Sequence, residues 1–285
     1  MQPDALALTW PVFAAVLLGA LLHASWNALV KSSTDKSLDM AVIHVIASLM
    51  AVPLVILVGW PSAAAWPFIL TSVTIHIAYY IATTQAYKHG DLGLTYPLMR
   101  GVAPLLVALS ATYTLHEKLS PIAWAGIVGI SCGVLALGLT RQVWHAPKAV
   151  GFALANAVII AIYTVVDALG VRASGNAMQY IAALFLLDGW PFALLMLARR
   201  GKPMLTYARQ RWPIASLGAL ASLGSYGIAL WAMTRAPVAT VAALRETSVL
   251  FAALLGAWLL KEAFTLRRLL GTCLIVAGVM AIRLA

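Results

Sequence analysis

Two arginines within long apolar segments are the residues best suited to bind a ligand in this sequence. Arg100 and Arg245 each lie several residues from the nearest expected helix end. An ionised side chain inside a membrane is costly unless it faces a wet cavity or a partner, and a guanidinium matches a carboxylate or phosphate. We expect both arginines to bind a solute anion. The alternative is an internal ion pair, for instance between Arg245 and a carboxylate; neighbouring Glu246 points elsewhere on the helix and does not simply pair with Arg245.

The first apolar segment carries a polar and aromatic stripe. His23, Trp26 and Asn27 follow the spacing i, i+3, i+4, so they share one helix face. Such a face on an apolar helix is typical of a cavity lining. The alternative is structural: Asn27 would bond to a neighbouring helix and His23 would be a satisfied core residue.

The same spacing recurs in two further segments. His76, Tyr79 and Tyr80 share a face, and Tyr163 lies four residues before Asp167. A carboxylate beside a membrane cavity can take up and release a proton, so Asp167 is the candidate for proton coupling. Alternatively, Asp167 lies in water at a helix end, because the expected segment ends at residue 168.

Further aromatic residues are expected near the same cavity. Tyr96, Tyr226 and Trp231 add ring surface, which suits a cation cage. Aromatic residues of membrane helices also serve in packing and in belts at the membrane surface. The sequence therefore leaves an aromatic cation site open as the rival of the arginine site.

The elements that must position these residues are membrane helices. Of the 285 residues, 62% are hydrophobic and only 10% are charged, far from the composition of soluble domains. The net charge of +10 lies in short gaps between apolar runs, so it indicates membrane orientation and not nucleic-acid binding. Runs of about 20 apolar residues predict ten spans, at 10–30, 38–59, 66–87, 92–114, 120–140, 148–168, 177–197, 212–233, 237–260 and 265–284.

This organisation bears on the class of protein. The spans leave no room for a soluble catalytic domain, and no HExxH or paired acidic motif occurs. We predict no enzyme, catalytic residue, metal or cofactor. A ring of charges or a filter typical of a channel is also missing. The basic segment 198–211 is expected to be a surface connection that touches anionic lipid.

The sequence repeats itself at an offset of 145 residues. Arg100 matches Arg245 and Glu117 matches Glu262. The glycines at 126 and 133 match those at 271 and 278, and their spacing fits close helix contact between halves or between protomers. We predict repeats at 1–145 and 146–285. Each holds five helices, so the second enters the membrane upside down, as in many secondary transporters.

Glu117 and Glu262 stand at expected helix ends. We interpret both as structural residues that cap the start of the following helix or pair with Lys118 and Lys261.

The distribution of Lys and Arg predicts an orientation. The gaps after odd-numbered spans hold 13 of them and the other gaps hold 4, which places both termini outside the cytoplasm. The 13 are Lys31, Lys36, Lys88, Arg141, Lys148, Arg199, Arg200, Lys202, Arg209, Arg211, Lys261, Arg267 and Arg268.

Two segments and two glutamates resemble a known family. The segments His23–Lys31 and Tyr96–Pro104, and the helix-ending Glu117 and Glu262, are similar to the EamA family of the drug/metabolite transporter superfamily. The resemblance implies a multi-pass carrier of the bacterial inner membrane, often an exporter of amino acids or related metabolites, with a central cavity. It also implies cytoplasmic termini, against the charge count.

The expected function is secondary-active export of small organic metabolites such as amino acids, by alternating access. The alternative is a carrier of quaternary or aromatic cations or drugs. The expected partners are a small-molecule substrate, the lipid bilayer and protons, with no nucleic acid. A ten-helix chain can work as a monomer, and a homodimer is the other option.

Overall fold

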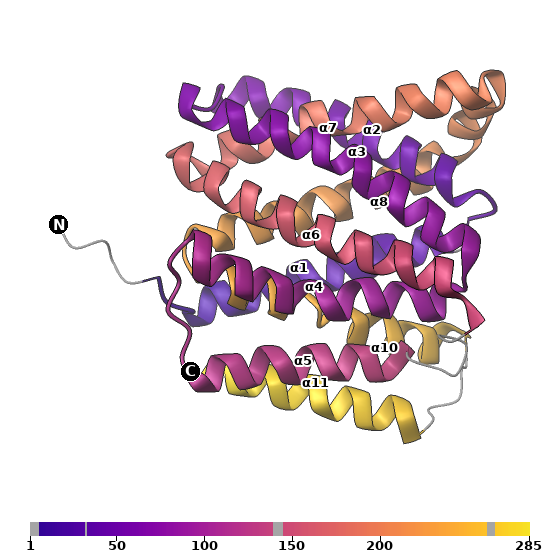
Figure 1. Cartoon of the computed structure of the whole chain (residues 1–285). Coiled ribbons are helices and arrows are strands. Elements are labelled where there is room, and N and C mark those ends of the chain that lie inside the picture. The colour runs from indigo at the N-terminus through magenta and orange to yellow at the C-terminus, as the bar shows by residue number, and fades with distance from the viewer. Residues whose placement is uncertain (1–5, 32, 139–144, 261–265) are drawn as a thin grey trace.

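The computed structural model describes residues 6–31, 33–138, 145–260 and 266–285 (Figure 1). This part of the chain is all helical, without a β-strand. Its elements are α1 (Trp10–Lys31), α2 (Lys36–Val58), the short 3-10 helix η1 (Ala63–Ala65), α3 (Trp66–His89), α4 (Leu92–Thr114), α5 (Pro121–Gly138), α6 (Pro147–Ala173), α7 (Ala177–Arg200), α8 (Lys202–Met233), α9 (Val238–Arg245), α10 (Ser248–Leu260) and α11 (Leu266–Leu284).

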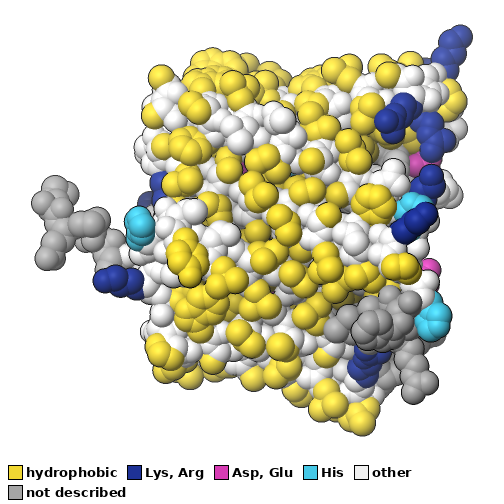
Figure 2. Space-filling model, viewed as in Figure 1, with side chains coloured by type: hydrophobic (Ala, Val, Ile, Leu, Met, Phe, Trp, Pro, Cys, Tyr) yellow, Lys and Arg dark blue, Asp and Glu magenta, His cyan; other side chains and the backbone are white. Residues whose placement is uncertain are grey.

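The helices form a polytopic membrane protein. Within the described residues, the eight helices α1 to α8 are long and apolar enough to cross a bilayer. Large apolar side chains such as Ile56, Leu57 and Leu217 are 77%, 80% and 63% exposed, a burial pattern that suits lipid and not water. Figure 2 shows hydrophobic side chains over most of the viewed face, with Lys and Arg at the two ends.

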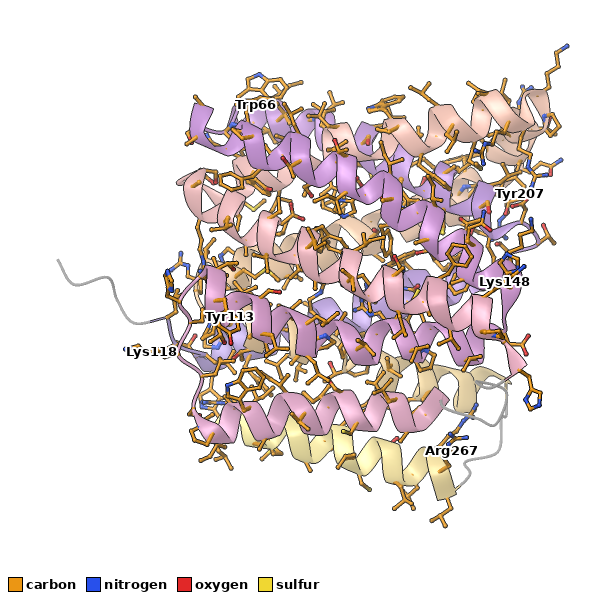
Figure 3. The ribbon with its side chains drawn as sticks, viewed as in Figure 1. Trp66, Tyr113, Lys118, Lys148, Tyr207 and Arg267 are labelled. Carbon is orange, nitrogen blue, oxygen red and sulfur yellow. The ribbon has the colours of Figure 1, made fainter. Side chains whose placement is uncertain are left out.

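The two ends of the bundle differ in charge. The start of α1 and the C-terminus lie at the left end of Figure 1, and Figure 2 shows the larger gathering of Lys and Arg at the right end. In Figure 3, Trp66, Tyr113 and Lys118 mark the left end, and Lys148, Tyr207 and Arg267 mark the right. Lys148 and Arg267, two of the basic residues counted in the sequence, therefore lie at the end opposite the start of α1 and the C-terminus.

The basic segment 198–211 is exposed along most of its length and is nearly all helical, so only one residue connects the two helices; its contact with anionic lipid stays a prediction. Helix α7 continues to Arg200 and α8 begins at Lys202, so Gly201 alone joins them. Gly201 has φ 60°, in the left-handed region that glycine adopts without strain. Arg211 is tied into the bundle, since its Nε donates to Asp39 Oδ1 at 3.3 Å.

The ninth expected span, 237–260, is not one continuous helix. It breaks after Arg245 and resumes at Ser248 as α10. Tight i to i−3 bonds cross the break, from the Glu246 amide to the Ala243 carbonyl and from the Thr247 amide to the Leu244 carbonyl. The Thr247 hydroxyl also donates to the Leu244 carbonyl at 2.7 Å. Local side-chain bonding of this kind competes with the helical ladder, which explains the interruption.

Glycines bring α5 and α11 into close contact. A Cβ built on Gly126 would lie 2.7 Å from the carbonyl oxygen of Gly278, and one built on Gly133 would lie 2.8 Å from that of Gly271. Bare backbone at both sides permits this approach. The glycine contact expected from the sequence thus falls between these two helices, which form one edge of the bundle (Figure 1).

Candidate functional site

A cavity of about 60 Å³ lies between the helices. Helices α1, α2, α3, α4, α6, α7, α8 and α9 all contribute to it. The lining side chains are His23, Trp26, His44, His76, Tyr79, Tyr80, Arg100, Tyr163, Leu184, Phe185, Asp188, Ser222, Tyr226 and Arg245.

Nine of the twelve residues predicted to bind substrate line this cavity, namely His23, Trp26, His76, Tyr79, Tyr80, Arg100, Tyr163, Tyr226 and Arg245. The other three do not. Asn27 donates to the His23 carbonyl of its own helix at 2.8 Å, Tyr96 packs against the core, and Trp231 lines a second hollow with Arg172 and Arg235. That these residues bind a substrate stays a prediction.

The stripe on α1 is held by contacts within the helix. Trp26 Nε1 donates to His23 Nδ1 at 3.3 Å, and the two rings meet edge to face with centroids 5.3 Å apart. His23 Nδ1 is therefore the acceptor nitrogen. Since both side chains are also on the cavity wall, the stripe presents one aromatic surface in a fixed orientation.

Tyrosines and one histidine form a second aromatic surface. The His76 ring lies 4.4 Å from that of Tyr163, which in turn meets Tyr79 at 5.8 Å and Tyr226 at 6.1 Å. These residues come from α3, α6 and α8, so the packing of three helices builds the wall. Such a surface can hold the apolar part of a solute or a cation.

The two arginines have different partners. Arg100 Nε donates to Glu246 Oε2 at 2.8 Å, and both side chains are buried. Arg245 lies over the ring of Tyr226, 4.9 Å from its centroid, and forms no ion pair with any described residue. The internal pair weighed for Arg245 thus belongs to Arg100, formed with Glu246 at the helix break. Arg245 is therefore the cavity arginine without an ion pair among the described residues, although Nη2 of Arg100 also has no hydrogen-bond partner there.

An acidic centre that sequence reasoning missed lies on α7. Tyr80 donates to Asp188 Oδ2 at 2.7 Å. The Nδ1 atoms of His44 and His76 lie 3.9 and 3.7 Å from its carboxylate oxygens. Asp188 is a lone acid in an apolar run. A charge buried in the membrane is costly unless it faces a wet cavity or a partner, so the reasoning used for Arg100 would also have predicted Asp188 as a site residue.

Packing between α2 and α7 fixes the acidic centre. The Ser48 hydroxyl donates to the Phe185 carbonyl at 2.6 Å and accepts from the Gly189 amide at 3.2 Å. A side chain placed between these helical i, i+4 partners loosens the ladder of α7, and Pro191 removes one further amide donor. The helix therefore depends on α2 at the turn that carries Asp188.

Asp167 is buried and does not line the cavity. It accepts hydrogen bonds from Tyr180 at 2.8 Å and from Tyr226, one to each carboxylate oxygen. Helix α6 continues to Ala173, so the alternative that Asp167 lies in water at a helix end is wrong. Its part in proton coupling stays a prediction.

Glu117 is structural but not in the way expected. It accepts from the backbone amides of Val238 at 2.8 Å and Ala239 at 3.3 Å, so it caps α9 and not the following helix α5. Its ion-pair partner is Arg172, at 3.1 Å, and not Lys118. Glu262 and Lys261 lie outside the described residues.

Replacing Glu117 by alanine is expected to lower the free energy of unfolding by about 1–2 kcal/mol, the usual cost of a lost N-terminal cap. The two α9 amides lose their acceptor and Arg172 loses its carboxylate. Unfolding in mixed micelles with increasing dodecyl sulfate measures the change. Glu117→Gln keeps an acceptor oxygen and should lose less; equal stability of the alanine variant and the parent would contradict the capping role.

Comparisons with known proteins agree with a transporter fold. Residues 147–284 match the model of the EamA-like transporter family. No curated protein matches the chain. A solved crystal structure of a protein shares 20% of its sequence with this chain and superposes with a TM-score of 0.74, over 94% of this chain and 97% of the other. At that identity the likeness shows the fold alone.

Proposed function

Because residues 147–284 of this chain belong to the EamA-like transporter family, we propose that the protein is a secondary carrier in the bacterial inner membrane. It exports small organic metabolites that bear an anionic group, such as amino acids, by alternating access around the cavity. The observation that carries the choice of solute is Arg245, a buried cavity-lining arginine without an ion-pair partner among the described residues.

The packing of the helices supports two repeats of five. With an offset of 145 residues, α1 to α5 correspond to α6, α7, α8, the pair α9 and α10, and α11. The contact of α1 with α8 then has its counterpart in α3 with α6, and that of α2 with α8 in α3 with α7. The contacts α2 with α7, α4 with α9 and α5 with α11 are their own counterparts. A two-fold axis between the repeats produces this pattern.

The glycine contacts support an inverted relation. Gly126 meets Gly278 and Gly133 meets Gly271, so α5 and α11 run in opposite directions. These glycines are also matched by the repeat, 126 with 271 and 133 with 278. Two matched helices that pack antiparallel with exchanged partners are expected of copies inserted upside down. Rocking of such copies would open the cavity to one side while closing the other.

Both proposed repeats contribute residues to the cavity wall. Arg245 offers a fork of donors to a carboxylate, while the wall of Tyr79, Tyr163 and Tyr226 suits the remainder of the solute. A monomer can therefore form the solute site.

A carrier of organic cations is the second candidate. It is favoured by the aromatic wall together with Asp188, whose Oδ1 has no hydrogen-bond partner in the part of the chain that the structure describes. In that function Arg245 would serve only to pack on Tyr226, and the solute would lie against the rings and Asp188.

Arg245→Ala separates the two candidates. Loss of a hydrogen bond to a charged group costs about 1.5–3 kcal/mol, so we expect roughly 10- to 100-fold weaker competition by amino acids. Counterflow in proteoliposomes measures it, with unlabelled amino acids, amines and sugars as competitors. The solute that accelerates exchange of its labelled form identifies the substrate class.

Arg283→Ala is the matched control, because Arg283 also stacks on an aromatic ring, that of Trp10 at 4.0 Å, but does not line the cavity. It should transport as the parent does. If Arg245→Ala leaves the counterflow of amino acids unchanged, the anion site is contradicted. If the variant keeps the counterflow of amines and loses that of amino acids, the second candidate is favoured.

A further inference from the structure

The acidic centre on α7 has a defined direction of hydrogen bonding. The Tyr80 hydroxyl has one hydrogen and donates it to Asp188 Oδ2. The same hydroxyl oxygen lies 3.2 Å from His44 Nδ1, so this nitrogen must be the donor to it. The result is a chain of donors from His44 through Tyr80 to Asp188, which joins α2, α3 and α7.

His76 is oriented in a similar way. Its Nδ1 lies 2.9 Å from the Ser72 carbonyl oxygen, which can only accept. The Nδ1 hydrogen is therefore engaged within α3. Asp188 Oδ1, 3.7 Å from this nitrogen, has no hydrogen-bond partner among the described residues. Asp188 Oδ1 is thus a carboxylate oxygen on the cavity wall that can still accept a proton or a hydrogen bond.

The charges around Asp188 do not neutralise it when its histidines are neutral. The titratable groups on the cavity or bonded at its wall are His23, His44, His76, Tyr79, Tyr80, Arg100, Tyr163, Asp167, Tyr180, Tyr226, Arg245 and Glu246. Of the arginines, Arg100 is paired with Glu246, and Arg245 lies on Tyr226. A bare carboxylate in a membrane interior is costly unless it binds a partner.

We infer that Asp188 is the proton-binding group of the carrier, with the proton on Oδ1 and with Tyr80, His44 and His76 as positioning residues. This deepens the proposed function and rests on it. The proton reaches Oδ1 from water on one side of the membrane and leaves from the same oxygen to the other side. Asp167, with both oxygens bonded to tyrosines, is not required for that step.

The position of the centre links the proton to the conformational change. Tyr80, His44 and His76 belong to the repeat proposed at 1–145, and Asp188 belongs to the repeat at 146–285. A hydrogen bond from Tyr80 to a carboxylate is stronger than one to a neutral acid. Protonation of Asp188 therefore weakens a bond between the repeats, and the equilibrium between their two arrangements shifts.

The test uses proteoliposomes that contain the full chain and the solute found by counterflow, with the membrane potential held at zero. With one proton exchanged per solute, a gradient of about one pH unit drives about tenfold accumulation. Accumulation of the solute on the acidic side of the membrane indicates exchange for protons, and accumulation on the alkaline side indicates cotransport with them. We expect Asp188→Asn to lose the gradient-driven accumulation that Asp167→Asn keeps.

A second measurement needs no solute. Infrared difference spectra of the purified protein, taken between high and low pH, report a protonated carboxyl band. The band of Asp188 should be missing from Asp188→Asn, return in Asp188→Glu and persist in Asp167→Asn. The infrared measurement tests proton binding by Asp188 separately from the proposed transport function, because it can be made even when the protein exchanges no solute.

Three results overturn the inference. One is gradient-driven accumulation by Asp188→Asn equal to that of the parent. Another is an infrared band that persists in this variant or disappears in Asp167→Asn. The third is loss of counterflow in Asp188→Asn together with loss of competition by amines, which assigns Asp188 to a solute ammonium.

Discussion

Arg100→Met is expected to lower the free energy of unfolding by about 3–5 kcal/mol, the cost of breaking a buried ion pair from one side. Glu246 would remain buried at the break between α9 and α10 without the guanidinium that now donates to it at 2.8 Å. Arg245, which lines the cavity, precedes Glu246 directly, so the loss should also weaken transport. Unfolding in mixed micelles and counterflow measure the two effects.

The double variant Arg100→Met/Glu246→Gln should recover much of the lost stability, because no uncompensated charge remains. Arg200→Met is the surface control. Arg200 pairs with Asp35 at 3.6 Å with its side chain 55% exposed, and such pairs contribute about 0–1 kcal/mol. Equal losses in the single and double variants would show that Arg100 acts by packing, not by its charge.

The same double variant decides whether Arg100 binds the solute. If Arg100 serves only to hold Glu246, counterflow returns with stability. If Arg100 also contacts the anion, stability returns but the affinity for the solute does not. The two roles left open for the arginines by the sequence are therefore separable by experiment.

Much of the fold could be predicted because the bilayer imposes a length on each helix. Runs of about 20 apolar residues locate α1 to α8 to within a few residues at most ends. The exceptions lie where polar sequence stays helical, as at Lys202–Arg211, or where local bonding interrupts apolar sequence, as at Glu246 and Thr247. Apolar length carries no information on either feature.

The candidate site was predictable where polar residues share a helix face, as for His76, Tyr79 and Tyr80. It was not predictable where a single polar residue stands in an apolar run, as for His44 and Asp188, because their importance depends on the contact between α2 and α7. The exclusion of Asn27 from the lining likewise depends on a bond to its own helix, which spacing does not reveal.

Gly189→Ala is expected to destabilise the protein by about 3 kcal/mol, at the upper end of the usual cost of overpacking. A Cβ at Gly189 would lie inside the contact distance of the His44 carbonyl oxygen and the Ser48 hydroxyl, and 2.6 Å from the His44 carbonyl carbon. Backbone atoms of a packed helix cannot turn away as a flexible side chain can. Helices α2 and α7 would have to separate, which moves Asp188 away from His44.

Gly151→Ala is the matched control for this prediction, because the same change in α6 adds a Cβ that meets no atom within 4 Å. There alanine should stabilise the helix by about 0.5–1 kcal/mol, since it reduces the entropy lost on folding. If glycine-to-alanine lowers the stability at residue 189 and raises it at residue 151, the loss at residue 189 comes from the contact between helices and not from helix propensity. If both variants gain stability, α2 and α7 do not approach as closely as described, and the proton site that depends on their contact loses its support.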